Sequence, residues 1–221
     1  MIFSIVNFDS KDWADREGLA YVLHINGYFN AFITRKFYDE MMEDPEDIRW
    51  NVLWESKGSR AEEVVKNLPD ANPDMKMFIG KYPGKAALKD MRTNDIPVIR
   101  LAEVYLNAAE AAFKLGDKQT ALKYLNVIVK RANPTKSVAE SDLTLERILK
   151  ERAKELVGEG HRFYDLMRND LRCERFYKGK AGWHGALLPE SRSFDHTYYR
   201  VILPIPESEL NANPTLRSQQ N

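Results

Sequence analysis

Apolar residues recur every three or four positions between residues 100 and 117, which is the spacing of one face of an α-helix. This face consists of Leu101, Ala102, Tyr105, Ala108, Ala109, Ala112 and Phe113. The opposite face, which we expect to contact water, carries Glu103, Asn107, Glu110 and Lys114. Gly116 is expected to end the helix, because glycine adopts a left-handed conformation past the last turn without steric cost. The pattern predicts an amphipathic helix that buries one face.

Two further helices are expected downstream. The second starts after Asp117, whose side-chain oxygen can accept a hydrogen bond from a free amide of the first helical turn. Its apolar face consists of Ala121, Leu122, Leu125, Ile128 and Val129. The third has Ser141 or Asp142 as its expected cap and Gly158 just after its end. Its apolar face consists of Leu145, Ile148, Leu149, Ala153, Leu156 and Val157.

The first two helices, joined by a tight turn, resemble a tetratricopeptide unit. The matching positions are Tyr105, Ala108, Ala109, Ala112, Gly116, Asp117, Ala121, Leu125 and Ile128. Only one copy of the repeat is visible in the sequence. Because such a unit buries its apolar face by stacking on neighbours, we expect other segments, within or outside this chain, to cover it.

The rest of the chain shows shorter patterns. A buried strand is expected at residues 2–6 and another strand at residues 76–82. A short helix is expected after Thr34, which is a suitable cap. Residues 173–199 hold no period and contain several glycines, so we expect a long surface loop there. An extended piece and a turn of helix opening near Pro206 are expected to follow.

Composition narrows the class of protein. Hydrophobic residues make up 43% of the 221 residues, which is enough for a core. The 33 basic and 33 acidic residues leave a formal net charge of zero, so nothing favours nucleic-acid binding. The lone Cys173 cannot form an internal disulfide bond, and His24, His184 and His196 share no spacing typical of a metal site. The first residues are too short an apolar run for a signal peptide or a membrane span.

Three segments together resemble the C-terminal part of the SusD/RagB family. The first is carried by Pro97, Arg100, Leu101, Ala102, Glu103, Tyr105, Leu106, Ala109, Glu110, Ala111, Gly116, Asp117 and Ala121. The second is carried by Glu151, Arg152, Glu155, Leu156, Glu159, Gly160, Arg162, Phe163, Asp165, Leu166 and Arg168. The third is carried by Leu203, Pro204, Ile205, Pro206, Glu209, Asn213, Pro214 and Leu216. Residues 2–5 and 47–49 also look familial, so the resemblance covers nearly the whole chain.

The resemblance implies a mostly α-helical fold, with a tetratricopeptide-like helical hairpin scaffold, long irregular loops and a few short strands. It also implies a nutrient-binding lipoprotein of the Bacteroidetes outer membrane, at the cell surface. Such a protein captures ligand, usually glycan or oligosaccharide, and passes it to a SusC-like TonB-dependent transporter. A lipid anchor and an N-terminal helical half normally precede this region, so we expect residues 1–221 to be a fragment of a larger single-domain protein. We expect no enzyme activity and no cofactor.

The segment EGHRFYDLMR invites an enzymatic interpretation, because Glu159, His161 and Asp165 bring an acid, a base and a carboxylate close together in sequence. The spacing favours a structural interpretation. Arg162, Asp165 and Arg168 are three positions apart, so on a helix they form a ladder of opposite charges. We expect this motif to brace the fold, together with Arg100 and Glu103 of the first segment.

Aromatic residues in loops are the candidates for ligand contact, since sugar capture needs flat apolar faces beside a few polar groups. The candidates are Trp13, Tyr28, Trp50, Trp54, Trp183 and His184. For each of them taken alone, a role in core or loop packing is the favoured interpretation, because tryptophan is well buried on average.

Three alternatives stay open at the level of sequence. Capture of peptide in place of glycan is the nearest. An intracellular tetratricopeptide-like adaptor, which binds a partner helix or tail on its concave face, is the second. A glycoside hydrolase is the third, and it would need two carboxylates flanking a sugar, a pair that nothing in the sequence fixes.

Overall fold

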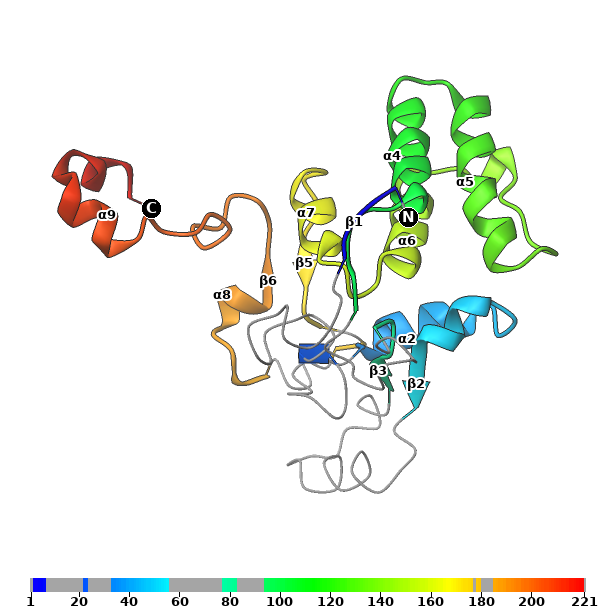
Figure 1. Ribbon diagram of the computed structural model, residues 1–221, viewed down its shortest axis with the longest axis horizontal. Coiled ribbons are helices and arrows are strands. Elements are labelled where there is room, and N and C mark those ends of the chain that lie inside the picture. Colours follow the sequence, from blue (N-terminus) through cyan, green and yellow to red (C-terminus); the bar gives the residue numbers. More distant parts are fainter. Residues whose placement is uncertain are drawn as a thin grey trace. The chain divides into compact units, whose positions relative to one another are not determined.

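The computed structural model describes residues 2–6, 22–23, 33–55, 77–82, 94–176, 178–179 and 185–220, and it is mostly helical (Figure 1). The chain divides into two compact units, residues 1–162 and 163–221. The first unit contains β1 (Phe3–Ile5), α2 (Arg35–Met42), η1 (Ile48–Val52), β2 (Leu53–Glu55), β3 (Met77–Ile79), β4 (Ile96–Ile99), α4 (Leu101–Lys114), α5 (Lys118–Ala132), η4 (Glu140–Asp142) and α6 (Leu145–Glu155). The second contains β5 (Cys173–Glu174), α8 (Pro189–Arg192), β6 (Ser193–Phe194), α9 (Glu207–Ala212) and η6 (Pro214–Gln219), and α7 (His161–Met167) spans the boundary.

The predicted helical hairpin is present as α4 and α5 (Figure 1). Gly116 has a φ of +84°, and its N–H donates to Phe113 O (3.0 Å) while the N–H of Asp117 donates to Ala112 O (2.9 Å). These two bonds satisfy carbonyls that the end of the helix leaves free. The side chain of Asp117 accepts a hydrogen bond from Thr120 N (3.0 Å) and so caps α5, as predicted.

α6 packs against both helices of the hairpin, and the three enclose the larger apolar core. This core consists of Ala102, Leu106, Ala109, Ala112, Ala121, Leu125, Ile128, Val129, Val138, Leu143, Ile148 and Leu156. Small alanines on α4 and α5 let the backbones approach closely. The cap predicted for α6 was wrong by a few residues, because Thr144 and not Ser141 or Asp142 accepts the hydrogen bond from Arg147 N (3.0 Å).

The two faces predicted for α4 need two corrections. Leu101 lies at the first helical position and is 52% exposed, whereas Leu106, absent from the predicted face, is fully buried. Glu110 was expected to contact water but is only 3% exposed. It forms ion pairs with Lys114 (3.1 Å) and with Arg152 of α6 (3.9 Å), so α6 covers part of the face that appears polar in the sequence.

A second apolar core lies around α2, η1 and the antiparallel pair of strands β2 and β3. It consists of Leu23, Ile33, Met41, Leu53, Ile79 and Tyr82. Thr34 caps α2 as predicted, by accepting a hydrogen bond from Phe37 N (3.2 Å). Gly158 has a φ of +76°, and a Cβ at this position would lie 2.9 Å from Ile79 Cγ2. The chain therefore needs glycine where it leaves α6 and passes this core.

The strand predicted at residues 2–6 exists as β1, which pairs antiparallel with β4. The prediction that it is buried was wrong. Ile2, Phe3, Ile5 and Val6 are each more than half exposed in this chain. An apolar run indicates a strand, but the sequence does not say which segment covers it.

The second unit corrects another expectation, since residues 173–199 do not form one long loop. Strands β5 and β6 pair antiparallel, with Cys173 opposite Phe194, and α8 precedes β6. The helical turn expected near Pro206 is α9, which has Pro206 at its cap position. Within the described residues, no helix is long and apolar enough to cross a lipid bilayer.

Candidate functional site

A largely buried network of charged side chains in the first unit joins η1, the residues that follow β3 and β4, α5 and α6. We call it the charge network, and its members are Asp47, Arg49, Lys81, Arg100, Arg131, Arg147, Glu151, Glu155 and Glu159. α6 supplies Arg147, Glu151 and Glu155, which share one face because they are four positions apart. Arg49, Arg100 and Arg131, which come from other segments of the chain, form ion pairs with the glutamates of this face.

Glu159 lies at one end of the charge network and is held by two cations. Arg100 binds it through both carboxylate oxygens, with Nε to Oε2 at 2.8 Å and Nη2 to Oε1 at 2.8 Å. Lys81 Nζ forms an ion pair with the same carboxylate and donates to the carbonyl of Glu155 (2.9 Å). The bidentate geometry fixes the direction of the Arg100 side chain as well as its charge.

Glu151 lies at the other end and pairs with Arg49 Nη1 (2.6 Å) and Arg147 Nη1 (2.7 Å). Arg49 also donates from Nε and Nη2 to Asp47, at 2.9 Å and 2.6 Å. Between the two ends, Glu155 pairs with Arg131 and Arg100, and Arg49 Nη1 lies 3.6 Å from Glu155 Oε2, so the network is continuous along α6.

The pairing determines the protonation of the network. Burial by itself would raise the pKa of Glu159, but hydrogen bonds from Arg100 and the charge of Lys81 outweigh it, so that pKa lies below its ordinary value. Asp47 has a lowered pKa for the same reasons, with Arg49 as the partner. Burial beside Glu159 raises the pKa of Tyr82 to about 12. Glu159 is therefore ionised at neutral pH and holds no proton to donate as a general acid.

The charged side chains of the segment that invited an enzymatic interpretation contact other protein groups. The predicted ion pair between Asp165 and Arg168 is present at 2.7 Å. Arg162 donates to the carbonyl of Leu149 (3.3 Å), and His161 Nδ1 lies 3.9 Å from Glu103 Oε1. In the part of the chain that the structure describes, no group of three or more His, Cys, Asp or Glu side chains could hold a metal ion.

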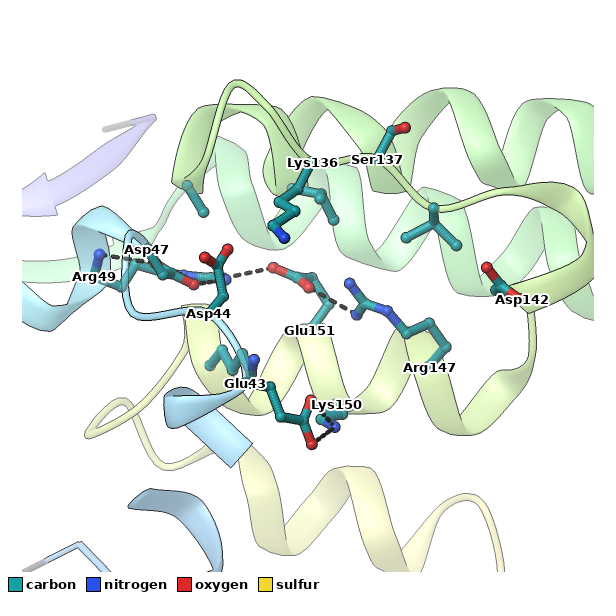
Figure 2. Close-up of a pocket in the computed structure, with 14 residues that line it drawn as sticks. Glu43, Asp44, Asp47, Arg49, Lys136, Ser137, Asp142, Arg147, Lys150 and Glu151 are labelled. Atoms are coloured by element: carbon teal, nitrogen blue, oxygen red, sulfur yellow. Dashed lines mark hydrogen bonds and ion pairs between the residues drawn. The ribbon is translucent and has the colours of Figure 1, made fainter. Parts of the chain in front are cut away.

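A polar pocket of about 210 Å³ opens beside the Glu151 end of the charge network (Figure 2). It lies between the segment joining α2 to η1, the end of α5, the segment leading to η4, and α6. Its lining residues are Glu43, Asp44, Asp47, Arg49, Val129, Ala132, Lys136, Ser137, Val138, Asp142, Arg147, Lys150, Glu151 and Lys154. Most of these side chains are charged, so the pocket differs from the aromatic site that the sequence favoured.

Of the six aromatic candidates for ligand contact, the structure describes Trp50 and the backbone of Trp54. Trp50 is half-buried, donates from Nε1 to Asp44 O (3.1 Å), and meets Tyr38 edge to face with ring centroids 5.6 Å apart. Trp54 lies in β2, where its backbone pairs with Phe78, and its side chain is outside the description. The remaining four lie outside the described residues: Trp13, Tyr28, Trp183 and His184.

Sequence reasoning missed the pocket and the central role of Arg49. A local signal existed for one pair, since Arg147 and Glu151 are spaced as i and i+4 on an amphipathic helix. The contact between Arg49 and Glu151 has no such signal, because it joins the short 3₁₀ helix η1 to α6, which lies far away in the sequence.

Comparisons with known proteins all lead to one family. The model of the SusD family matches residues 8–221. A SusD-like protein of Formosa agariphila is 35% identical over 133 residues, which are 54% of this chain and 22% of that protein. The starch-binding protein SusD of Bacteroides thetaiotaomicron is 36% identical over 129 residues, which are 57% of this chain and 21% of that protein.

Solved structures agree with the sequence relatives. A putative sugar-binding protein from Bacteroides vulgatus superposes with a TM-score of 0.79 at 36% identity, over 96% of this chain and 44% of the other. A SusD superfamily protein from Bacteroides thetaiotaomicron gives 0.77 at 35% identity, over 96% of this chain and 47% of the other. The chain thus spans less than half the length of these solved structures, and the matched stretches are about a fifth of the curated relatives.

Proposed function

The chain belongs to the SusD family, and we propose that it is the C-terminal region of a cell-surface protein that binds carbohydrate. The whole protein would be a lipid-anchored nutrient receptor of the outer membrane. It would capture glycan and pass it to a partner TonB-dependent transporter. The observation that carries the proposal is the family match over residues 8–221, supported by relatives whose names state starch binding and sugar binding.

We propose binding without bond cleavage. Acid and base catalysis of glycoside hydrolysis needs a carboxylic acid with a raised pKa and a second carboxylate across the sugar. Glu159 has a lowered pKa and two cationic partners, and Asp165 is paired with Arg168. This arrangement supports a structural role for the motif.

For ligand contact we propose the aromatic residues named from the sequence. The indole of Trp50 contributes to packing beside Tyr38, so its share of any ligand contact is limited to the exposed part of the ring. Trp13, Tyr28, Trp54, Trp183 and His184 complete the proposed set. Their rings suit sugars, since an apolar ring face beside polar groups is the usual lining of a small-ligand site.

A glycan array with the purified chain tests this function, and a peptide pool tests the nearest alternative. We expect glycan to be retained and Trp183→Ala to weaken binding by about 1.4 kcal/mol, or tenfold in Kd, as expected when an aromatic anchor is lost. Tyr164→Ala is the matched control, since Tyr164 is an aromatic residue with 68% exposure outside the proposed set. Retention of peptides with no retention of glycan would overturn the carbohydrate proposal.

The transporter partner needs a separate experiment in cells. We expect a tagged full-length protein to co-purify from outer membranes with a TonB-dependent transporter, and to carry a lipid at its N-terminus. Recovery from the cytosol without lipid would contradict both the proposed location and the partner.

A further inference from the structure

The polar pocket shown in Figure 2 has an unequal supply of hydrogen-bond donors and acceptors. Three of its acidic side chains are committed to cations. Glu43 pairs with Lys150, Asp47 with Arg49, and Glu151 with both Arg49 and Arg147. Each of these three carboxylates therefore already has a cationic partner.

The other two acidic side chains also have donors. Asp44 accepts two contacts from Asn133 Nδ2, at 2.9 Å and 3.0 Å. Asp142, which is exposed, accepts a hydrogen bond from the hydroxyl of Ser141 (3.3 Å). Every carboxylate of the lining therefore has at least one donor.

Two ammonium groups have no acceptor. Within the described residues, the side-chain ammonium group of neither Lys154 nor Lys136 forms a hydrogen bond or an ion pair. Lys136 is exposed, and Figure 2 shows it extending toward Asp44 and Glu151. Lys154 lines the same pocket although it is only 8% exposed. A cation buried to this degree is normally paired.

The charges around Lys154 come from α6, from η1 and from Glu43 at the end of α2. Burial lowers the pKa of Lys154, Arg49 and Lys150 lower it further, and the nearby charges of Glu151 and Glu43 only partly oppose this. The surrounding carboxylates therefore do not fully compensate burial and the neighbouring cations, and the charged form of Lys154 is disfavoured. An anion placed in the pocket would supply what the protein does not.

We propose that this pocket binds one oxyanion group of an acidic sugar, a carboxylate or a sulfate ester, with Lys154 as the buried donor and Lys136 as the exposed donor. A volume of about 210 Å³ is below the usual range for a whole small ligand, which fits one charged group and not an oligosaccharide. The choice of a sugar as carrier rests on the proposed function. The choice of an oxyanion does not, since it is argued from the two lysines whose ammonium groups have no acceptor.

The test is a titration followed by ¹H–¹⁵N NMR, with sodium glucuronate, glucose 6-sulfate and neutral glucose as probes. We expect glucuronate, glucose 6-sulfate or both to shift amide signals around the pocket, and glucose to leave them in place. A response to one probe alone supports the proposal and identifies the group. Equal shifts with glucose, or no shift with either acidic probe, would overturn it.

Lys154→Gln assigns the effect to one residue. Because a hydrogen bond to a charged group is lost, binding of the acidic probe should weaken roughly tenfold or more. Lys130→Gln removes an exposed charge from α5 outside the lining and should change the affinity by about twofold or less. If Lys154→Gln does not fold, the wild-type titration alone decides, since the shifts must include the amides of residues 150–154.

The outcome is separable from the proposed glycan function. Neutral glycans on the array should bind Lys154→Gln as well as they bind the wild type. If the chain retains no neutral glycan but glucuronate still binds in the pocket, the glycan proposal fails and the oxyanion site stands. If neutral glycan binds and neither acidic probe does, the reverse holds.

Discussion

The hairpin core and the charge network stabilise neighbouring parts of one unit by different means. α4 and α5 meet through small and aliphatic side chains close together in sequence, and their apolar face is continuous. The charge network joins Arg100 to Glu159 across 59 positions and Lys81 to Glu159 across 78. Apolar burial tolerates substitutions that keep the volume, whereas a buried ion pair depends on both partners. The two regions should therefore respond differently to mutation.

The largest effect is expected from breaking the charge network at Arg49. Arg49→Met leaves Asp47 without its ion pair and Glu151 with only Arg147, so the free energy of unfolding should fall by about 4 kcal/mol. Urea denaturation measures it. Arg172→Met, which removes exposed contacts with Asp195, Glu174 and Ser193, is the control for exposed charge and should cost about 1 kcal/mol or less. Equal losses for the two variants would mean that burial adds nothing to the network.

A somewhat smaller effect is expected in the hairpin core. Leu125→Ala removes a fully buried side chain and should lower the free energy of unfolding by about 3 kcal/mol. Leu115 is 86% exposed, so Leu115→Ala should change the stability by about 0.5 kcal/mol or less. Leu125→Met, which nearly conserves volume, should recover most of the loss. A Leu125→Ala protein as stable as the wild type would show that the core is not packed as described.

A paired glycine experiment separates backbone strain from packing, since Gly158 lies against the second apolar core and Gly116 in the open turn of the hairpin. Gly158→Ala should cost about 2 kcal/mol, because φ is positive and the new methyl group would crowd Ile79. Gly116→Ala should cost about 1 kcal/mol, since φ is also positive but no atom lies within 4 Å of the added Cβ. Thermal unfolding of both variants measures the difference. Identical losses would assign the whole effect to backbone strain.

The smallest effect is a dependence on pH. Because the pKa of Glu159 is lowered on folding, its ionised form stabilises the protein above the unfolded value of 4.5, and this contribution is lost as pH falls through the folded value. The stability difference between the wild type and Glu159→Gln should be full at neutral pH and shrink in acid. Urea titrations at several pH values measure it. A difference that stays constant into acid would contradict the lowered pKa.

The periodic part of the sequence predicted the hairpin well. Gly116 and Asp117 mark its turn, and the capping bonds expected there are present. The burial of Glu110 could not be predicted, because it depends on Arg152 of a third helix. The exposure of Phe3 in β1 could not be predicted for a similar reason, since hydrophobicity alone does not indicate which segment covers a strand.

The candidate site was less accessible to sequence reasoning. A period of 3.6 residues reports on neighbours along one helix, and it carries no information about the partner of Arg49. The lining of the pocket comes from segments between Glu43 and Lys154 that are distant in the sequence, and only the fold brings them together. The ion pair of Asp165 with Arg168 could be predicted because both residues lie within one turn of helix or its end.

The central claim is that the charged family motif braces the fold and does not perform catalysis. The most direct measurement is the coupling energy between Arg100 and Glu159, from urea unfolding of Arg100→Met, Glu159→Gln and the double variant. The bidentate contact predicts a coupling of about 2 kcal/mol, with any glycan binding retained in each folded variant. A coupling near zero, together with loss of glycan binding or turnover in Glu159→Gln alone, would contradict the claim.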